Sequence, residues 1–141
     1  MLVNLHTLAN EAHQCRTPKQ FRILLCHVRV LIPYSHFAGI WGYPKKTTIR
    51  FVFNEGFPED LLRWRLTTGV MWASPLFHEW LKTNRVYLWS DAVKELKEPI
   101  DPQLKVRMEK AHVQHSLVGG RAARDYFVMF AAAMASAEFG R

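Results

Sequence analysis

The chain has 141 residues and a mass of 16.5 kDa, the size of one ordinary domain with its own hydrophobic core. Hydrophobic residues make up 49% of it and charged residues 22%, which excludes a disordered, collagen-like or disulfide-scaffold chain. A formal net charge of +7 and a pI of about 9.7 suit an anionic partner such as nucleic acid or a membrane surface. We therefore treat residues 1–141 as a single domain whose basicity poses a question about partners.

Cysteine usage and hydropathy indicate a cytoplasmic protein. The two cysteines, Cys15 and Cys26, show neither a Cys-x-x-Cys spacing nor a histidine pattern for zinc. Residues 1–12 lack the basic and apolar regions of a secretory signal. The longest apolar stretch, residues 126–137, is far shorter than the roughly 20 residues that a bilayer crossing needs. We expect a reduced thiol environment and no membrane partner.

Two helices are predicted in the first third of the chain. Leucine and alanine recur with helical spacing over residues 2–12, and a longer amphipathic pattern begins at Pro18 and ends near Pro33. Cys26 falls on this second helix. Adjacent helical residues point about 100° apart, so we expect a buried, inert thiol rather than a nucleophile activated by His27.

The middle of the chain predicts a β-hairpin followed by helices. Residues 35–43 and 47–53 are rich in aromatic and β-branched side chains on either side of a Pro-Lys-Lys turn. A Phe-Pro pair at residues 57–58 then opens a helix, with two acids where the helix dipole favours them. A further helix is expected from Pro75.

Beyond residue 85 the pattern changes from strand to helix. Residues 86–89 form a compact strand pattern, and the charged segment 92–100 is expected to be a loop or a short helical turn. An Asp-Pro pair at residues 101–102 starts a helix with an apolar, core-facing side. The core-facing positions of that helix are Leu104, Val106, Met108 and Ala111.

Two strands are predicted at the end of the chain, over residues 115–118 and 126–133, with Gly-Gly-Arg at residues 119–121 as a turn signal. The order of all the elements predicts an α/β fold of the α+β kind. Its expected architecture is a GAF/PAS-like α-β-α sandwich, with a central, mostly antiparallel five-stranded sheet and helices on both faces.

No catalytic constellation is found in the sequence. Gly119 and Gly120 lack the spacing of a phosphate-binding loop, and there is no nucleophile elbow or metalloprotease motif. His112 and His115 lie three residues apart, but no carboxylate or cysteine at ligand spacing completes a metal site. The prediction is a protein that is not an enzyme and uses no metal and no cofactor.

Basic residues are scattered along the chain rather than gathered on one helix. The sequence has no helix-turn-helix turn, no zinc-finger spacing and no RNP-like strand. We therefore expect a solvated basic surface, without direct nucleic-acid recognition by this segment.

Aromatic residues concentrate between residues 37 and 89, which include all five tryptophans. Two interpretations follow from this pattern alone. The aromatics fill a core between sheet and helices, or they wall an apolar pocket for a small organic ligand. In the second case Arg65, Ser74 and indole N–H groups are the polar contacts.

Three motifs occur in a fixed order in this region: Phe57-Pro58, Ser74-Pro75 and Tyr87-Leu88-Trp89. This order resembles the ligand-sensing, autoinducer-binding N-terminal domain of LuxR-type transcriptional regulators, over roughly residues 18–137. The sequences at residues 80–89 and 111–130 are most similar to the exopolysaccharide-regulator (EpsA-like) branch of that group.

The resemblance implies a sensor and homodimerisation domain that binds a small organic ligand. In that family DNA is bound by a C-terminal helix-turn-helix, a module absent from this chain, so DNA is expected as a partner only through such a module. The implied ligand-binding residues lie in the aromatic region. They are Phe57, Leu61, Arg65, Trp72, Ser74, Leu76, Phe77 and Trp89.

The sequence departs from the family at the positions that hold the polar head of an acyl-homoserine lactone. Where the resemblance implies Trp, Tyr and Asp, this chain has Leu61, Arg65 and Ser74, and Trp89 alone keeps the family residue. A hydroxyl accepts more weakly than a carboxylate, and a leucine has no donor. We expect a ligand other than an ordinary acyl-homoserine lactone. Arg65 either pairs with an anionic ligand or lies at the surface, and a ligand-free dimerisation module is the alternative.

Overall fold

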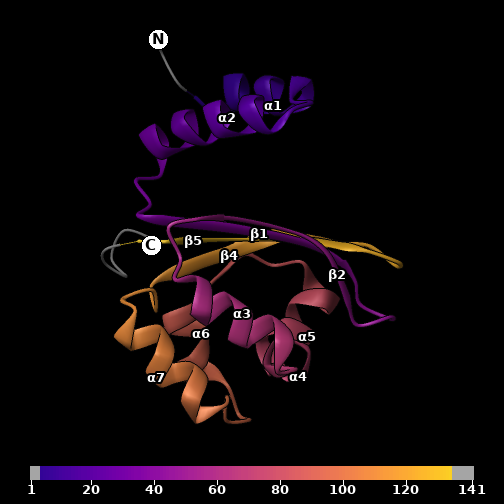
Figure 1. Cartoon of the computed structure of the whole chain (residues 1–141), viewed down its shortest axis with the longest axis vertical. Helices are drawn as coiled ribbons and strands as arrows, with labels where there is room; N and C mark the ends of the chain where they lie inside the picture. Colours follow the sequence, from indigo (N-terminus) through magenta and orange to yellow (C-terminus); the bar gives the residue numbers. More distant parts are fainter. Residues whose placement is uncertain (1–3, 135–141) are drawn as a thin grey trace. The chain divides into compact units, whose positions relative to one another are not determined.

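A computed structural model describes residues 4–134 of the chain. These residues fall into two compact units, the first ending at Tyr34 and the second beginning at Ser35 (Figure 1). None of the helices between residues 4 and 134 combines the length and the hydrophobicity that a bilayer crossing requires. Each unit has its own secondary structure and its own stabilising contacts.

The first unit consists of two helices, α1 (Leu5–Gln14) and α2 (Pro18–Leu31), which confirms the two predicted helices. On α2, Leu24 and Leu25 are buried but Cys26 is exposed. The expectation of a buried thiol is therefore wrong. The reason is the helical rotation of about 100° per residue, which turns Cys26 away from the side that Leu24 and Leu25 bury.

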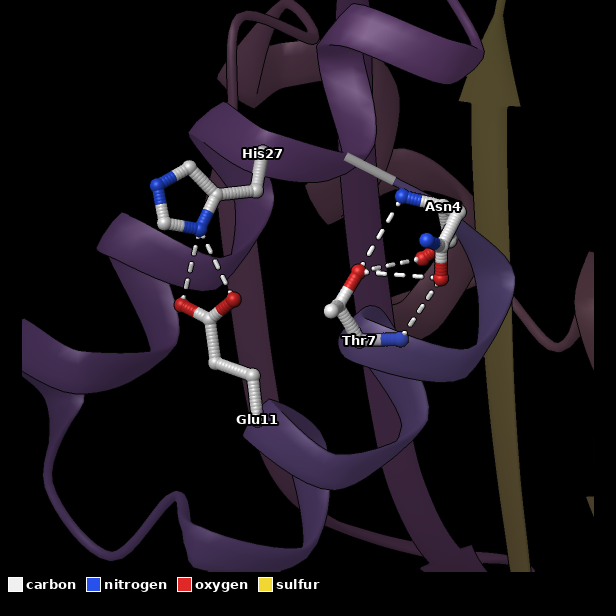
Figure 2. A network of polar contacts seen from close by, with 4 residues as sticks. All are labelled: Asn4, Thr7, Glu11 and His27. Carbon is white, nitrogen blue, oxygen red and sulfur yellow. Dashed lines mark hydrogen bonds and ion pairs between the residues drawn. The ribbon is translucent and has the colours of Figure 1, made fainter. Parts of the chain in front are cut away.

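Side-chain contacts cap the N-terminus of α1 and connect α1 to α2, as Figure 2 shows. The Asn4 side chain accepts a hydrogen bond of 2.9 Å from the Thr7 backbone N–H, and the Thr7 hydroxyl lies 3.1 Å from the Asn4 backbone nitrogen. This reciprocal arrangement is a capping box. Between the helices, His27 Nδ1 lies 2.7 Å from Glu11 Oε2, a contact that becomes a salt bridge when the imidazole is protonated.

The second unit is built on an antiparallel sheet with the strand order β2-β1-β5-β4-β3. All of its neighbouring strands run antiparallel, so the predicted α+β class and five-stranded sheet are confirmed. β5, the last strand among the described residues, lies at the centre. The strands are β1 (His36–Tyr43), β2 (Thr48–Glu55), β3 (Tyr87–Leu88), β4 (Ser116–Ala122) and β5 (Phe127–Ala133).

Five helices of this unit lie together along one face of its sheet (Figure 1). Local sequence explains where they begin: α5 and α7 start at prolines, and Asp101 accepts a hydrogen bond of 2.8 Å from the backbone N–H of Gln103. The helices are α3 (Glu59–Thr67), α4 (Val70–Ala73), α5 (Pro75–Thr83), α6 (Trp89–Glu95) and α7 (Pro102–Lys110).

The predicted strand over residues 86–89 is too long. β3 contains only Tyr87 and Leu88, and Trp89 is the first residue of α6. The helix continues to Glu95, within the segment expected to be a loop or a short helical turn. β3 is an edge strand that pairs with β4 at just two positions, so little holds the chain extended. Asp91 lies in the first turn of α6, where the helix dipole favours an acid.

Two further expectations are corrected by packing. Val106 is 61% exposed, because it lies about 200° around α7 from the buried Leu104. Gly119 and Gly120 lie inside β4 rather than in a turn, and the chain reverses after Ala123, whose backbone N–H donates to Tyr126 at 2.9 Å. The glycines belong in the strand for a steric reason, since the backbone of Gly120 approaches β5 closely.

Replacing Gly120 by alanine is expected to destabilise the chain by about 3 kcal/mol. A Cβ there would overlap the Val128 carbonyl oxygen, and the backbone has a φ of +131°. Urea unfolding followed by circular dichroism measures the loss.

Gly69→Ala is the matched control for this variant. Gly69 also has a positive φ, +80°, but an added Cβ would meet no atom within 4 Å. We expect it to lose about 1 kcal/mol, the ordinary cost of a left-handed alanine. Equal losses for the two variants would contradict the steric argument.

Candidate functional site

A cavity of about 70 Å³ lies within the second unit, between the sheet and the helices that cover it. Its wall is mostly apolar, and side chains from β1, β3, β4 and β5 face others from α3, α4, α6 and α7. The sheet side is formed by Ala38, Gly39, Ile40, Tyr87, Ser116, Val118, Met129 and Ala131, and the other side by Phe57, Leu62, Arg65, Leu66, Met71, Trp89 and Met108.

Small side chains in one row of the sheet account for this space. Ala38 on β1 and Val118 on β4 are both paired with Ala131 on the central strand. Paired residues point to the same face of a sheet, so two alanines and a valine lie side by side under the helices. Helices that rest on larger neighbouring side chains leave a gap over such a row.

Phe57 is held at the cavity by a short polar clamp. The Asn54 side chain accepts a hydrogen bond of 3.0 Å from the Phe57 N–H and donates one of 2.8 Å to the Phe57 carbonyl. The intervening Gly56 has a φ of +101°, which glycine adopts at little cost. These hydrogen bonds orient the buried Phe57 ring between the sheet and α3. The centroids of the Phe57 and His36 rings are 5.4 Å apart.

Arg65 brings a positive charge to the cavity wall. It lies on α3, half-buried, and its Nη1 is 3.9 Å from Met108 Sδ on α7. Between residues 4 and 134 no carboxylate forms a salt bridge with it. Burial lowers the pKa of Arg65, while the nearby Tyr87 raises it, and a guanidinium remains protonated at neutral pH.

Tyr87 and Trp89 add two neutral hydrogen-bond donors. Burial raises the pKa of Tyr87 from 10.0 to about 12, against the opposing effect of Arg65, so its phenol stays protonated at neutral pH. Trp89 is buried, and its indole N–H can donate but not accept. Within the described part of the chain neither side chain makes a hydrogen bond.

The structure places three of the eight predicted ligand-binding residues on the cavity wall: Phe57, Arg65 and Trp89. Leu61 and Leu76 are buried in the core cluster that also contains Phe57 and Trp89. They support the wall from behind without lining the cavity.

The other three predicted residues lie elsewhere. Trp72 and Phe77 pack edge-on against Phe127, with ring centroids 6.0 and 5.2 Å away, in a filled aromatic cluster. Ser74 precedes α5 and lines a separate groove near the start of α7. At Trp72 and Phe77 the structure therefore shows the core-filling role that aromatic composition alone left open.

Sequence reasoning did not assign several residues of the wall to a site. Tyr87 belongs to the Tyr-Leu-Trp motif, so its place in the site beside Trp89 could have been predicted from the sequence. Ala38, Ala131 and Met108 carried no such signal, because their roles depend on strand register and on the packing of α7.

The two histidines weighed as metal ligands do not share a helix face. His112 follows the end of α7 and has a φ of +57°, and His115 Nδ1 lies 3.1 Å from the Ser90 hydroxyl. Among residues 4–134 no three side chains of His, Cys, Asp or Glu are arranged to hold a metal ion.

No protein-family model matches the chain, and no curated protein matches its sequence. Its structure is similar to the crystal structure of CepR2 from Burkholderia cenocepacia, described as an N-acylhomoserine lactone dependent LuxR family transcription factor. The TM-score is 0.68 over 94% of this chain and 77% of that one, with 10% sequence identity. At this identity the likeness establishes a shared α+β fold.

The buried phenol of Tyr87 is expected to ionise at about pH 12. The unfolded chain releases the same proton near pH 10, so the free energy of unfolding is expected to fall as the pH rises between about 10 and 12. Tyrosinate absorbance during an alkaline titration measures the ionisation. Tyr87→Phe should remove the late step, and Tyr126→Phe, at an exposed tyrosine, should keep it. A late step that survives in Tyr87→Phe would contradict this assignment.

Proposed function

We propose that the chain is the ligand-sensing and dimerisation domain of a LuxR-type bacterial transcriptional regulator. The observation that carries the proposal is the apolar cavity between sheet and helices, where Arg65, Tyr87 and Trp89 leave hydrogen-bond donors unused. Such a cavity, with a few polar groups in an apolar wall, is typical of a small-molecule site. The fold shared with CepR2 supports the same class of protein.

The finer assignment rests on sequence motifs. We place the chain in the exopolysaccharide-regulator (EpsA-like) branch because of the sequences at residues 80–89 and 111–130. We do not expect an ordinary acyl-homoserine lactone as its ligand. Leu61 and Ser74 offer weaker or no polar contacts in that role, and neither lines the cavity.

Sensing in this proposal is a change in the packing of helices on the sheet. The cavity of about 70 Å³ is much smaller than the roughly 300–1,000 Å³ of most ligand pockets. A ligand must therefore displace wall elements, and α3, α4, α6 and α7 are the helices that contribute to that wall. The ligand favours the displaced arrangement by binding it more tightly. A helix-turn-helix module following the sensor domain would transmit the change to DNA, in the cytoplasm and without catalysis.

Ala131→Leu is expected to abolish ligand binding while preserving the fold. The added isopropyl group enters the cavity from the central strand, and filling a cavity commonly raises stability by about 0.5–2 kcal/mol. The measurement is a thermal-shift screen of small organic molecules against the purified chain. We expect the hits for the wild type to be lost in the variant.

Ala132→Leu is the control for this screen, because it lies on the same strand and points to the opposite face of the sheet. It should keep the thermal-shift hits. If no molecule stabilises the wild type, or if the hits persist in Ala131→Leu, the proposed sensing role fails.

A second candidate function is a ligand-free dimerisation module. The observation in its favour is the exposed pair Trp41 and Phe51, which face each other across β1 and β2 and are 38% and 57% exposed. We expect the chain to be a homodimer by light scattering, and Phe51→Arg to shift it toward the monomer. Arg50→Ala, at the exposed neighbouring position, should leave the dimer intact.

Light scattering and the thermal-shift screen together separate the two functions. A sensor retains its thermal-shift hits in Phe51→Arg, whereas a dimer that responds to no small molecule supports the ligand-free module. A monomeric wild type would contradict dimerisation in both.

A further inference from the structure

Arg65, Tyr87 and Trp89 on the cavity wall share one property, since each of them can donate a hydrogen bond. Arg65 has a guanidinium, Tyr87 a protonated phenol and Trp89 an indole N–H. On the sheet side, the hydroxyl of Ser116 already donates to the Val113 carbonyl at 2.6 Å. No carboxylate side chain lines the cavity, so a ligand that satisfies these donors must itself supply the acceptors.

The charge of Arg65 further restricts the chemical class of the ligand. Arg65 is half-buried, and a charge that is partly removed from water is costly unless it is paired. Within the described residues its polar neighbours are the Met108 thioether and the Tyr87 phenol. Neither of them carries a negative charge at neutral pH. Among residues 4–134, no group therefore supplies the negative charge that would compensate Arg65.

The presence of a single arginine at the cavity favours a carboxylate ligand over a phosphate ligand. One guanidinium matches one carboxylate in a planar, bidentate pair. A phosphate monoester carries about −1.5 to −2 charges at neutral pH, which a single arginine leaves partly uncompensated. The rest of the wall is apolar and contains Met71, Met108 and Met129, flexible side chains that adapt to ligands of different shape.

We propose that the ligand of this cavity is a carboxylate on an apolar aliphatic or aromatic body, with the carboxylate bound by Arg65 and the neighbouring Tyr87 and Trp89 donors. This inference rests on the proposed sensing function and names the chemical class of its ligand. The apolar body occupies the space over Ala38 and Ala131.

The test measures the melting temperature of the full chain with octanoate and hydrocinnamate, and with the neutral amides of the same two acids. Saturating carboxylate is expected to raise the melting temperature by about 5 °C, and the amides by less than a third of that. Inorganic phosphate should have no effect beyond that of chloride at equal ionic strength. Equal shifts with acid and amide overturn the anionic class but leave the sensing function standing.

Arg65→Gln should lose the response to both carboxylates. Arg63→Gln is the matched control, because Arg63 lies on the same helix and is exposed, so it removes the same charge without touching the cavity. Arg65→Lys keeps the charge without the planar fork and should respond by about half as much. If Arg63→Gln and Arg65→Gln lose the response equally, a general charge effect explains the data and the proposal is overturned.

The stability of the ligand-free chain gives an independent readout. Arg65→Met keeps an unbranched stem of similar length and removes the unpaired charge, so its melting temperature should rise by about 3 °C. A fall in melting temperature shows that the guanidinium supports the fold and overturns its role as a vacant ligand contact. Absence of any carboxylate shift also overturns the proposal, and the wider screen with Ala131→Leu then decides separately whether the cavity binds ligands.

Discussion

The central strand β5 determines which parts of the second unit are solid and which are hollow. At one end Phe127 is fully buried and packs edge-on against Phe77 and Trp80, so the aromatic cluster there is filled. Four residues further along β5, Ala131 lies between Ala38 and Val118, and the helices that cover this face meet little side-chain volume there. The cavity exists because a large residue and a small one occupy the same face of one strand.

The hollow end also changes the role of the residues that surround it. In a filled core Arg65 would meet apolar atoms on every side, whereas beside the cavity its charge has room for a partner. The same surroundings keep Tyr87 protonated, since burial opposes loss of its proton. Arginine, phenol and indole together make a donor-rich wall around an apolar space, which relates the packing of the sheet to the chemistry of a ligand.

The sequence features that were interpreted correctly are those whose effect is local. Pro75 and Pro102 begin helices as expected, because a fixed φ and a missing N–H suit a first turn whatever lies nearby. The prediction of a turn at Gly119-Gly120 was wrong. These glycines lie in a strand and allow the close approach of β5, which comes later in the sequence. The helix that begins at Trp89 was missed for a similar, non-local reason. β3 pairs with β4 at only two positions, and the side-chain pattern of residues 86–89 does not reveal how short that pairing is.

The sequence by itself determined the α+β class, the order and starts of most elements, and three residues of the candidate site, Phe57, Arg65 and Trp89. The class and the starts of the elements follow from side-chain type and spacing, which act over a few residues, whereas the three site residues were implied by the resemblance to LuxR-type sensor domains. Only the tertiary structure decided that Trp72 and Phe77 fill a core and that Ala38 and Ala131 leave a cavity. Strand register pairs residues more than ninety positions apart, as in Ala38 with Ala131, and no local pattern specifies that pairing.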